Sequence, residues 1–108
     1  MEFKTKHGHT LEIVAISDQL YQEAARNVGA KKGPDGPVAD DVEFGAEVAR
    51  LAIISWRTDT GEEPLRDKKP GDARAVIKRT IGLSEYVLSM AKEARKVEGK
   101  GFEVEKGN

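Results

Sequence analysis

The 108-residue sequence contains no cysteine, and this absence excludes several kinds of site. Without thiols there is no disulfide framework, no thiolate zinc site and no cysteine nucleophile. Long apolar runs are also missing, since the longest, Leu51–Ile54, falls far short of the roughly 20 residues that cross a bilayer. The N-terminus, Met1-Glu2-Phe3-Lys4, lacks the apolar stretch of a signal peptide. We therefore expect a protein with no membrane partner.

An excess of charge of either sign is missing too, because 18 basic and 19 acidic residues leave a net charge of −1. No global field therefore draws the chain to DNA or to an anionic membrane. The two histidines leave few candidates for a general base, and the sequence holds no Ser-His-Asp set, nucleotide fingerprint or metal cluster. These absences, together with the small size, predict that the protein is not an enzyme and uses no cofactor.

Hydrophobic periodicity in the first part of the chain predicts a hairpin followed by a helix. Residues 2–16 alternate between polar and apolar around Gly8, which can supply the positive φ of a tight connection. Ser17 is a good N-cap for a helix over about residues 18–28, with Gly29 as its stop. Three glycines and two prolines within residues 29–39 favour a flexible loop.

Three further helices are expected from residue 40 onward. Asp40 and Glu43 form a capping-box pattern for a helix that continues to about Trp56 and becomes apolar nearly all round. After a polar connection over residues 57–69, Pro70 suits the first position of the next helix. Gly82 is expected to end that helix. Its apolar stripe consists of Ala73, Val76, Ile77, Thr80 and Ile81.

The last helix is expected over about residues 85–97, capped by Ser84, and its inner face consists of Val87, Met90, Ala91, Ala94 and Val97. The fold class is therefore mainly α (α+β), with an N-terminal β-hairpin followed by about four helices in a small bundle. One globular domain is expected over residues 1–98, with a glycine-punctuated flexible tail over residues 99–108.

Three polar motifs have both a chemical and a structural interpretation. His7-Gly8-His9 offers two imidazoles to a metal ion but no third ligand, so a polar hairpin tip is favoured. Residues 33–37 lack the phosphate-loop pattern and are favoured as a linker. Asp40, Asp41 and Glu43 could bind a cation, but acids at this position commonly cap a helix. None of the three specifies a metal site.

Six cations against two acids within residues 66–79 make the most basic segment of the chain. A solvated basic face is the favoured interpretation, because no aromatic residues interleave and nucleic acid is an unlikely partner at this net charge. The alternative is a small nucleic-acid-associated regulatory module with an anion-binding face made of Arg74, Lys78 and Arg79.

The scarce large apolar side chains concentrate on the helix expected to end at Trp56. Trp56 either fills the core or anchors an interface, since large aromatic side chains serve both purposes. An apolar surplus on one helix favours a scaffold that completes its burial with a partner. The residues predicted to bind that partner are Phe44, Val48, Leu51, Ile54, Trp56, Tyr86 and Met90.

The segment from Val48 to Ala94 resembles the small tail assembly chaperones of long-tailed bacteriophages. It has an apolar helix that ends in Ile54-Ser55-Trp56, then the turn Arg57-Thr58-Asp59-Thr60-Gly61-Glu62-Glu63-Pro64-Leu65, and two closing helices separated by Gly82-Leu83. The opening Phe3-Lys4-Thr5-Lys6 and Thr10-Leu11-Glu12-Ile13 are similar to the hairpin of that family.

The resemblance implies a protein that binds the tape-measure protein in the host cytoplasm and keeps it soluble until tail-tube protein subunits arrive. It also implies self-association into a homo-oligomer, and in many relatives a longer frameshifted product. A helix with an apolar stripe can lie in a groove built from other helices, and a charged outer surface keeps such a complex soluble. A structural tail or connector subunit is the third alternative.

Overall fold

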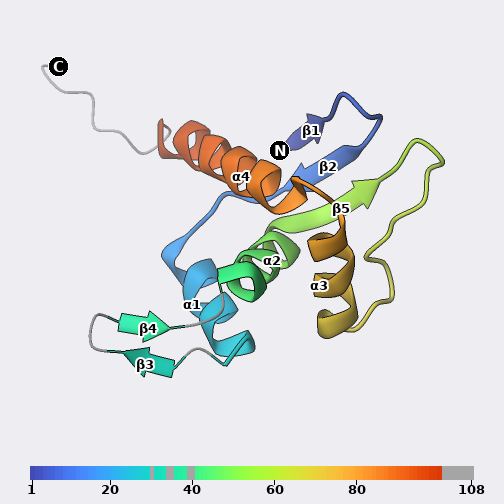
Figure 1. Ribbon diagram of the computed structural model, residues 1–108. Coiled ribbons are helices and arrows are strands. Elements are labelled where there is room, and N and C mark those ends of the chain that lie inside the picture. Colours follow the sequence, from blue (N-terminus) through green and yellow to red (C-terminus); the bar gives the residue numbers. More distant parts are fainter. Residues whose placement is uncertain (30, 34–35, 39–40, 101–108) are drawn as a thin grey trace, which may run out of the picture.

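The computed structural model describes residues 1–29, 31–33, 36–38 and 41–100, and its elements belong to the α+β class (Figure 1). The described strands are β1 (Glu2–Lys4), β2 (Thr10–Ile13), β3 (Lys31–Gly33), β4 (Gly36–Val38) and β5 (Ile53–Arg57). The described helices are α1 (Asp18–Asn27), α2 (Asp41–Ala52), α3 (Pro70–Arg79) and α4 (Leu83–Lys100). The expected combination of a hairpin and four helices is confirmed.

The N-terminal hairpin forms as the alternation predicts, and it gains a third strand from the middle of the chain. β1 and β2 pair antiparallel with Phe3 opposite Leu11, and Gly8 in the connection has a φ of 81°. β5 pairs antiparallel with the other side of β2, which gives the strand order β1-β2-β5. The three-stranded sheet therefore joins residues from both halves of the sequence.

The expectation of one helix from residue 41 to Trp56 is wrong, because α2 ends at Ala52 and β5 follows directly. Ile53-Ile54-Ser55-Trp56-Arg57 is rich in β-branched and aromatic residues, which suit a strand that has a partner. Glu12 lies opposite Ser55 and Ile13 opposite Ile53, so Ile54 is an extra residue in β5. This bulge leaves the Ile54 side chain 62% exposed.

Local capping signals place α1 and α3 correctly. The Ser17 side chain accepts a hydrogen bond from the backbone N–H of Leu20 at 3.1 Å, so it caps α1 as predicted. Pro70 occupies the first turn of α3. The predicted start and end of the last helix are wrong, because α4 already begins at Leu83 and continues to Lys100. Ser84 therefore lies inside α4 instead of capping it.

Helix α2 lies at the centre of the helical layer in Figure 1, in contact with α1, α3 and α4. Three of its buried residues are small, with Ala46, Ala49 and Ala52 all 0% exposed, so the neighbouring helices can approach it closely at these positions. The core also takes residues from the sheet and from α4, among them Leu11, Ile13, Trp56, Ile77, Val87 and Ala91.

Two short stretches within residues 29–39, the segment expected to form an irregular loop, are strands in the structure. Residues 31–33 and 36–38 pair antiparallel as a short second sheet, with Lys31 opposite Val38. Figure 1 shows this hairpin apart from the three-stranded sheet. Proline and glycine lower strand propensity without forbidding a short ladder at an edge, which is where this sequence places them. The first two residues of the tail predicted over residues 99–108 belong to α4, which continues to Lys100. Residues 101–108, and the predicted cap Asp40, lie outside the described residues.

Candidate functional site

The turn between α3 and α4 displays Ile81 completely, with an exposed fraction of 100%. Thr80 ends α3, and its hydroxyl donates a hydrogen bond to the carbonyl oxygen of Val76 at 2.9 Å. Gly82 then adopts a φ of 78°, and its carbonyl oxygen accepts the N–H of Tyr86 at 3.0 Å. The tight turn directs Leu83 into the core at 6% exposure and leaves Ile81 outside.

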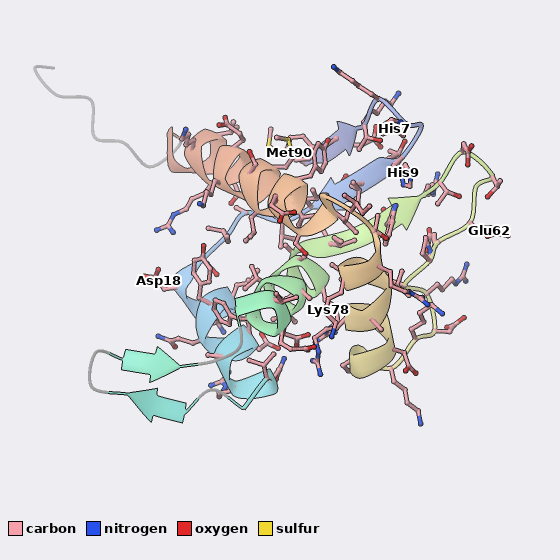
Figure 2. All side chains as sticks on the ribbon, viewed as in Figure 1. His7, His9, Asp18, Glu62, Lys78 and Met90 are labelled. Carbon is pink, nitrogen blue, oxygen red and sulfur yellow. The ribbon has the colours of Figure 1, made fainter. Side chains whose placement is uncertain are left out.

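A hollow of about 230 Å³ lies on one side of Ile81, between the N-terminal hairpin and the start of α4. The hairpin contributes His7 and His9, which Figure 2 shows at its turn end. Helix α4 contributes Leu83 and Tyr86, and burial raises the pKa of the Tyr86 hydroxyl. The hollow is large enough to accept an apolar side chain of a partner.

A second hollow of about 360 Å³ lies on the other side of Ile81, between α2, α3 and α4. Val42 of α2 and Leu88 of α4 line it, and Val42 is 64% exposed. We call Ile81, Val42, Tyr86 and Leu88 the Ile81 surface. Ile81 lines both hollows, Tyr86 lines the first, and Val42 and Leu88 line the second, so apolar side chains gather around Ile81, whereas single exposed apolar residues are ordinary on protein surfaces.

A partly buried polar contact supports the hairpin side of this surface. The indole N–H of Trp56 donates a hydrogen bond to Nδ1 of His9 at 2.8 Å, and the two ring centroids are 5.9 Å apart. Because Nδ1 accepts this bond, the neutral ring carries its proton on Nε2. Trp56 is only 3% exposed, so the contact satisfies its only polar atom and fixes the His9 ring beside the hollow.

A second polar cluster links three helices through Glu47 of α2, whose side chain is 0% exposed. Arg50 donates two hydrogen bonds to the carboxylate, both at 2.6 Å. Asn27 of α1 donates at 2.7 Å, and Arg74 of α3 donates at 3.0 Å. A buried carboxylate is tolerated when it is paired and hydrogen-bonded in this way, so the cluster holds α1 and α3 against α2.

The pKa of Glu47 reflects two opposing effects. Burial is the largest single cause and on its own raises the pKa, because it disfavours the charged form. Hydrogen bonds from Arg50, Asn27 and Arg74 act in the other direction and together hold the pKa of Glu47 below its ordinary value. The same carboxylate raises the pKa of Arg50. The carboxylate is therefore ionised at neutral pH and acts as a structural anchor.

The residues predicted to bind a partner fall into three groups. Val48 and Trp56 are 1% and 3% exposed, so they belong to the core and are not available at the surface. Phe44, Leu51 and Met90 are half-buried and pack against that core. Ile54 is exposed on the bulge of β5. Tyr86 is the only residue of the predicted set that lines a hollow beside Ile81. The structure therefore does not bring the predicted set together.

Two of the three cations of the alternative anion-binding face form ion pairs within the protein. Arg74 pairs with Glu47 at 3.0 Å and with Glu43 at 3.4 Å. Lys78 pairs with Glu43 as well, and Figure 2 shows Lys78 in the space between α2 and α3. Arg79 lines a separate polar hollow beside the connection between β5 and α3. The basic segment is therefore partly neutralised by acids from α2.

Within the described parts of the chain, no group of three or more His, Cys, Asp and Glu side chains could hold a metal ion. His7 and His9 lie in the connection of the hairpin, and Nδ1 of His9 already accepts a hydrogen bond from the indole N–H of Trp56. None of the described helices is both long enough and apolar enough to cross a bilayer.

Sequence reasoning missed the exposure of Ile81 and the role of Glu47. Ile81 continues the i, i+4 spacing of Ala73 and Ile77, and the signal against its burial is Gly82 directly after it. Glu47 interrupts a largely apolar stretch of α2. This pattern indicates a buried carboxylate only when the residues that pair with it are known.

Comparison of the chain with protein-family models, with curated proteins and with solved structures finds no match in any of the three.

Proposed function

We propose that this protein is a tail assembly chaperone of a long-tailed bacteriophage, and that it binds an amphipathic helix of the tape-measure protein through the Ile81 surface. The single observation that carries the binding proposal is the complete exposure of Ile81 between two hollows. An apolar residue that projects beside a hollow can enter the groove between two rows of client side chains, while the hollow receives a client side chain.

The assignment to tail assembly is supported by the resemblance of the segment from Val48 to Ala94. On this proposal the protein acts in the host cytoplasm, holds the tape-measure protein in a soluble form, and gives way to tail-tube protein as the tail grows. Self-association is part of the same proposal. The described chemistry favours binding over catalysis, because the two polar clusters are occupied by internal partners.

The proposal is tested by co-expression with the tape-measure protein encoded in the same genome. The wild-type chain should raise the soluble fraction of the tape-measure protein and co-purify with it. Ile81→Asp should weaken the complex by at least about tenfold. It removes an isoleucine whose burial in the complex is worth about 1.5–3 kcal/mol, and it places a charge in the interface.

Ile54→Asp is the matched control, because Ile54 is the other strongly exposed isoleucine among the described residues and lies on β5. It should leave the complex intact. A wild-type chain that neither solubilises nor binds the tape-measure protein would overturn the chaperone assignment. A loss caused by Ile54→Asp but not by Ile81→Asp would overturn the Ile81 surface as the binding site.

Mass spectrometry of mature virions separates a chaperone from a structural tail or connector subunit. A chaperone is released when the tube is complete, so its peptides should be absent from purified particles. Peptides at a stoichiometry comparable to those of other tail proteins would support the structural alternative instead.

A further inference from the structure

A different hollow lies near the C-terminal end of α4 and has a volume of about 690 Å³. Its apolar lining comes from Ile16 before α1, Tyr21 of α1 and Val97 of α4, and Val97 is 51% exposed. Figure 1 shows this part of α4 at the opposite end of the helix from the turn with α3. Together with the charged residues of α4 that line it, Lys92, Glu93, Arg95 and Lys96, we call it the basic groove.

Cations outnumber acids at the basic groove by three to one. Lys96 pairs with Glu93 at 3.4 Å, and both side chains are exposed. Within the described part of the chain, neither Lys92 nor Arg95 forms an ion pair. The attraction between cations and the end of a helix is confined to its last turn, so it does not account for the charges at residues 92 and 95 of a helix that ends at Lys100.

We propose that the basic groove binds an acidic amphipathic segment of a partner protein. An apolar side chain of the partner would cover Val97, which is half exposed at the edge of the groove, and its Asp or Glu side chains would pair with Lys92 and Arg95. The charge of the groove is complementary to such a segment, and Val97 adds apolar area that a purely electrostatic site lacks.

The lining favours a protein segment over a nucleic acid. Single-stranded nucleic acids need aromatic faces on which bases stack. Among the residues that the structure describes, Tyr21 is the one aromatic residue that lines the groove, and its ring already stacks on Phe44 with the centroids 6.2 Å apart and the planes at 16°. Val97 offers an aliphatic contact that suits leucine, isoleucine or phenylalanine of a peptide, whereas Ile16 at the floor of the groove is only 3% exposed.

This proposal is independent of the Ile81 surface. Leu83 and Val97 stand near opposite ends of α4, about 21 Å apart at 1.5 Å per residue. Ile81→Asp should therefore leave binding at the basic groove unchanged, and changes at Lys92 and Arg95 should leave the Ile81 surface unchanged. Failure of one proposal is thus distinguishable from failure of the other.

The test uses a fluorescein-labelled synthetic peptide of 18 residues with leucine at i, i+3, i+4 and i+7 spacing and glutamate at most other positions. Its binding to the full chain is measured by fluorescence anisotropy at low salt. The Lys92→Glu/Arg95→Glu variant should bind it at least tenfold more weakly. Arg66→Glu/Lys68→Glu makes the same change in net charge on the connection between β5 and α3, and it should bind like the wild type.

Two further variants test the apolar part of the groove and the identity of its occupant. Val97→Asp should also weaken binding, and circular dichroism should show an unchanged helical content. Phe102–Glu105 of this chain has a similar apolar and acidic composition. Tighter peptide binding by Phe102→Ala/Val104→Ala would identify this segment as the occupant and overturn the proposal of an external partner.

Three other results would overturn the proposal. The first is equal loss of binding in the two charge-reversal variants, which would show that only net charge matters. The second is equal binding of a peptide with lysine in place of every glutamate. The third is displacement of the acidic peptide by a single-stranded DNA oligonucleotide at equal concentration, which would identify a nucleic-acid site.

Discussion

Trp56 and His9 are 47 positions apart in the sequence and are joined by a hydrogen bond of 2.8 Å from the indole N–H to Nδ1. The bond ties β5 to the connection between β1 and β2, beside the hollow that His9 lines. It also explains why the only tryptophan of the chain tolerates burial at 3% exposure, since its polar atom has a partner.

Replacement of His9 by phenylalanine should destabilise the protein by about 1–3 kcal/mol. The substitution keeps a ring but removes the acceptor, so the indole N–H of Trp56 is left buried without a partner. Urea denaturation monitored by circular dichroism measures the effect. His7→Phe is the control, because His7 is exposed on the same hairpin and should change stability by less than about 0.5 kcal/mol. Equal effects of the two substitutions would contradict the role of the hydrogen bond.

Substitution of Glu47 by glutamine should lower the free energy of unfolding by about 3–5 kcal/mol. The change removes the charge that compensates Arg50 and Arg74 while it leaves both cations in place. Glu93→Gln removes one carboxylate from an exposed pair with Lys96 and should have an effect below about 1 kcal/mol. Chemical denaturation of the two variants under identical conditions provides the comparison, and a Glu47→Gln effect as small as that of Glu93→Gln would contradict the anchoring role.

The Glu47 cluster also predicts how stability depends on pH. The folded-state pKa of Glu47 is lowered from the ordinary value of 4.5, so its contribution is fully present above pH 4.5 and is lost as the pH falls through the folded-state value. The difference in unfolding free energy between wild type and Glu47→Gln should therefore shrink below pH 4.5. Urea titrations between about pH 7 and pH 3 measure this difference. A difference that stays constant over that range would show that the carboxylate does not titrate as described.

Substitutions at Ser55 distinguish the observed strand from the helix that periodicity favours. Ser55 lies within β5 opposite Glu12, so valine should be preferred over alanine by up to about 1 kcal/mol. In a helix the order is reversed, because alanine has the higher helix propensity. Thermal or urea denaturation of Ser55→Val and Ser55→Ala gives the order directly.

Elements with local start or stop signals are predictable from the sequence. Ser17 caps α1, Pro70 opens α3, and Gly8 allows the hairpin connection, because each residue type satisfies a backbone requirement within a few residues of itself. The same reasoning fails at Ser84, where the helix already begins at Leu83. There the backbone N–H of Leu83 donates to the carbonyl oxygen of Thr80 at 3.1 Å, which satisfies one of the N–H groups that a helix start leaves without an intrahelical partner.

The boundary between α2 and β5 could not be derived from periodicity. Leu51–Trp56 is apolar enough to fit a buried helix or a strand, and such short runs are ambiguous. The choice depends on β2, a partner about 40 residues earlier, whose free side accepts β5. The bulge that exposes Ile54 is a consequence of that pairing and has no local signature.

At Ile81 in the candidate site, too, the sequence spacing and the observed exposure differ. Spacing places Ile81 on the face of Ala73 and Ile77, but α3 ends at Arg79 and the positive φ of Gly82 turns the chain before that face is continued. Whether a residue at the end of a stripe is buried depends on what packs beside it, and here α4 departs in a direction that leaves Ile81 in solvent.

The sequence by itself determined the class of the fold, the N-terminal hairpin and the starts of α1 and α3, because these depend on contacts within one turn or one hairpin. The tertiary structure decided that Trp56 belongs to the core and that Ile81 does not. It also decided that Glu47 meets Arg74 from 27 positions further along the chain. Long-range pairing and burial arise only when the elements pack together, so a local pattern does not contain them.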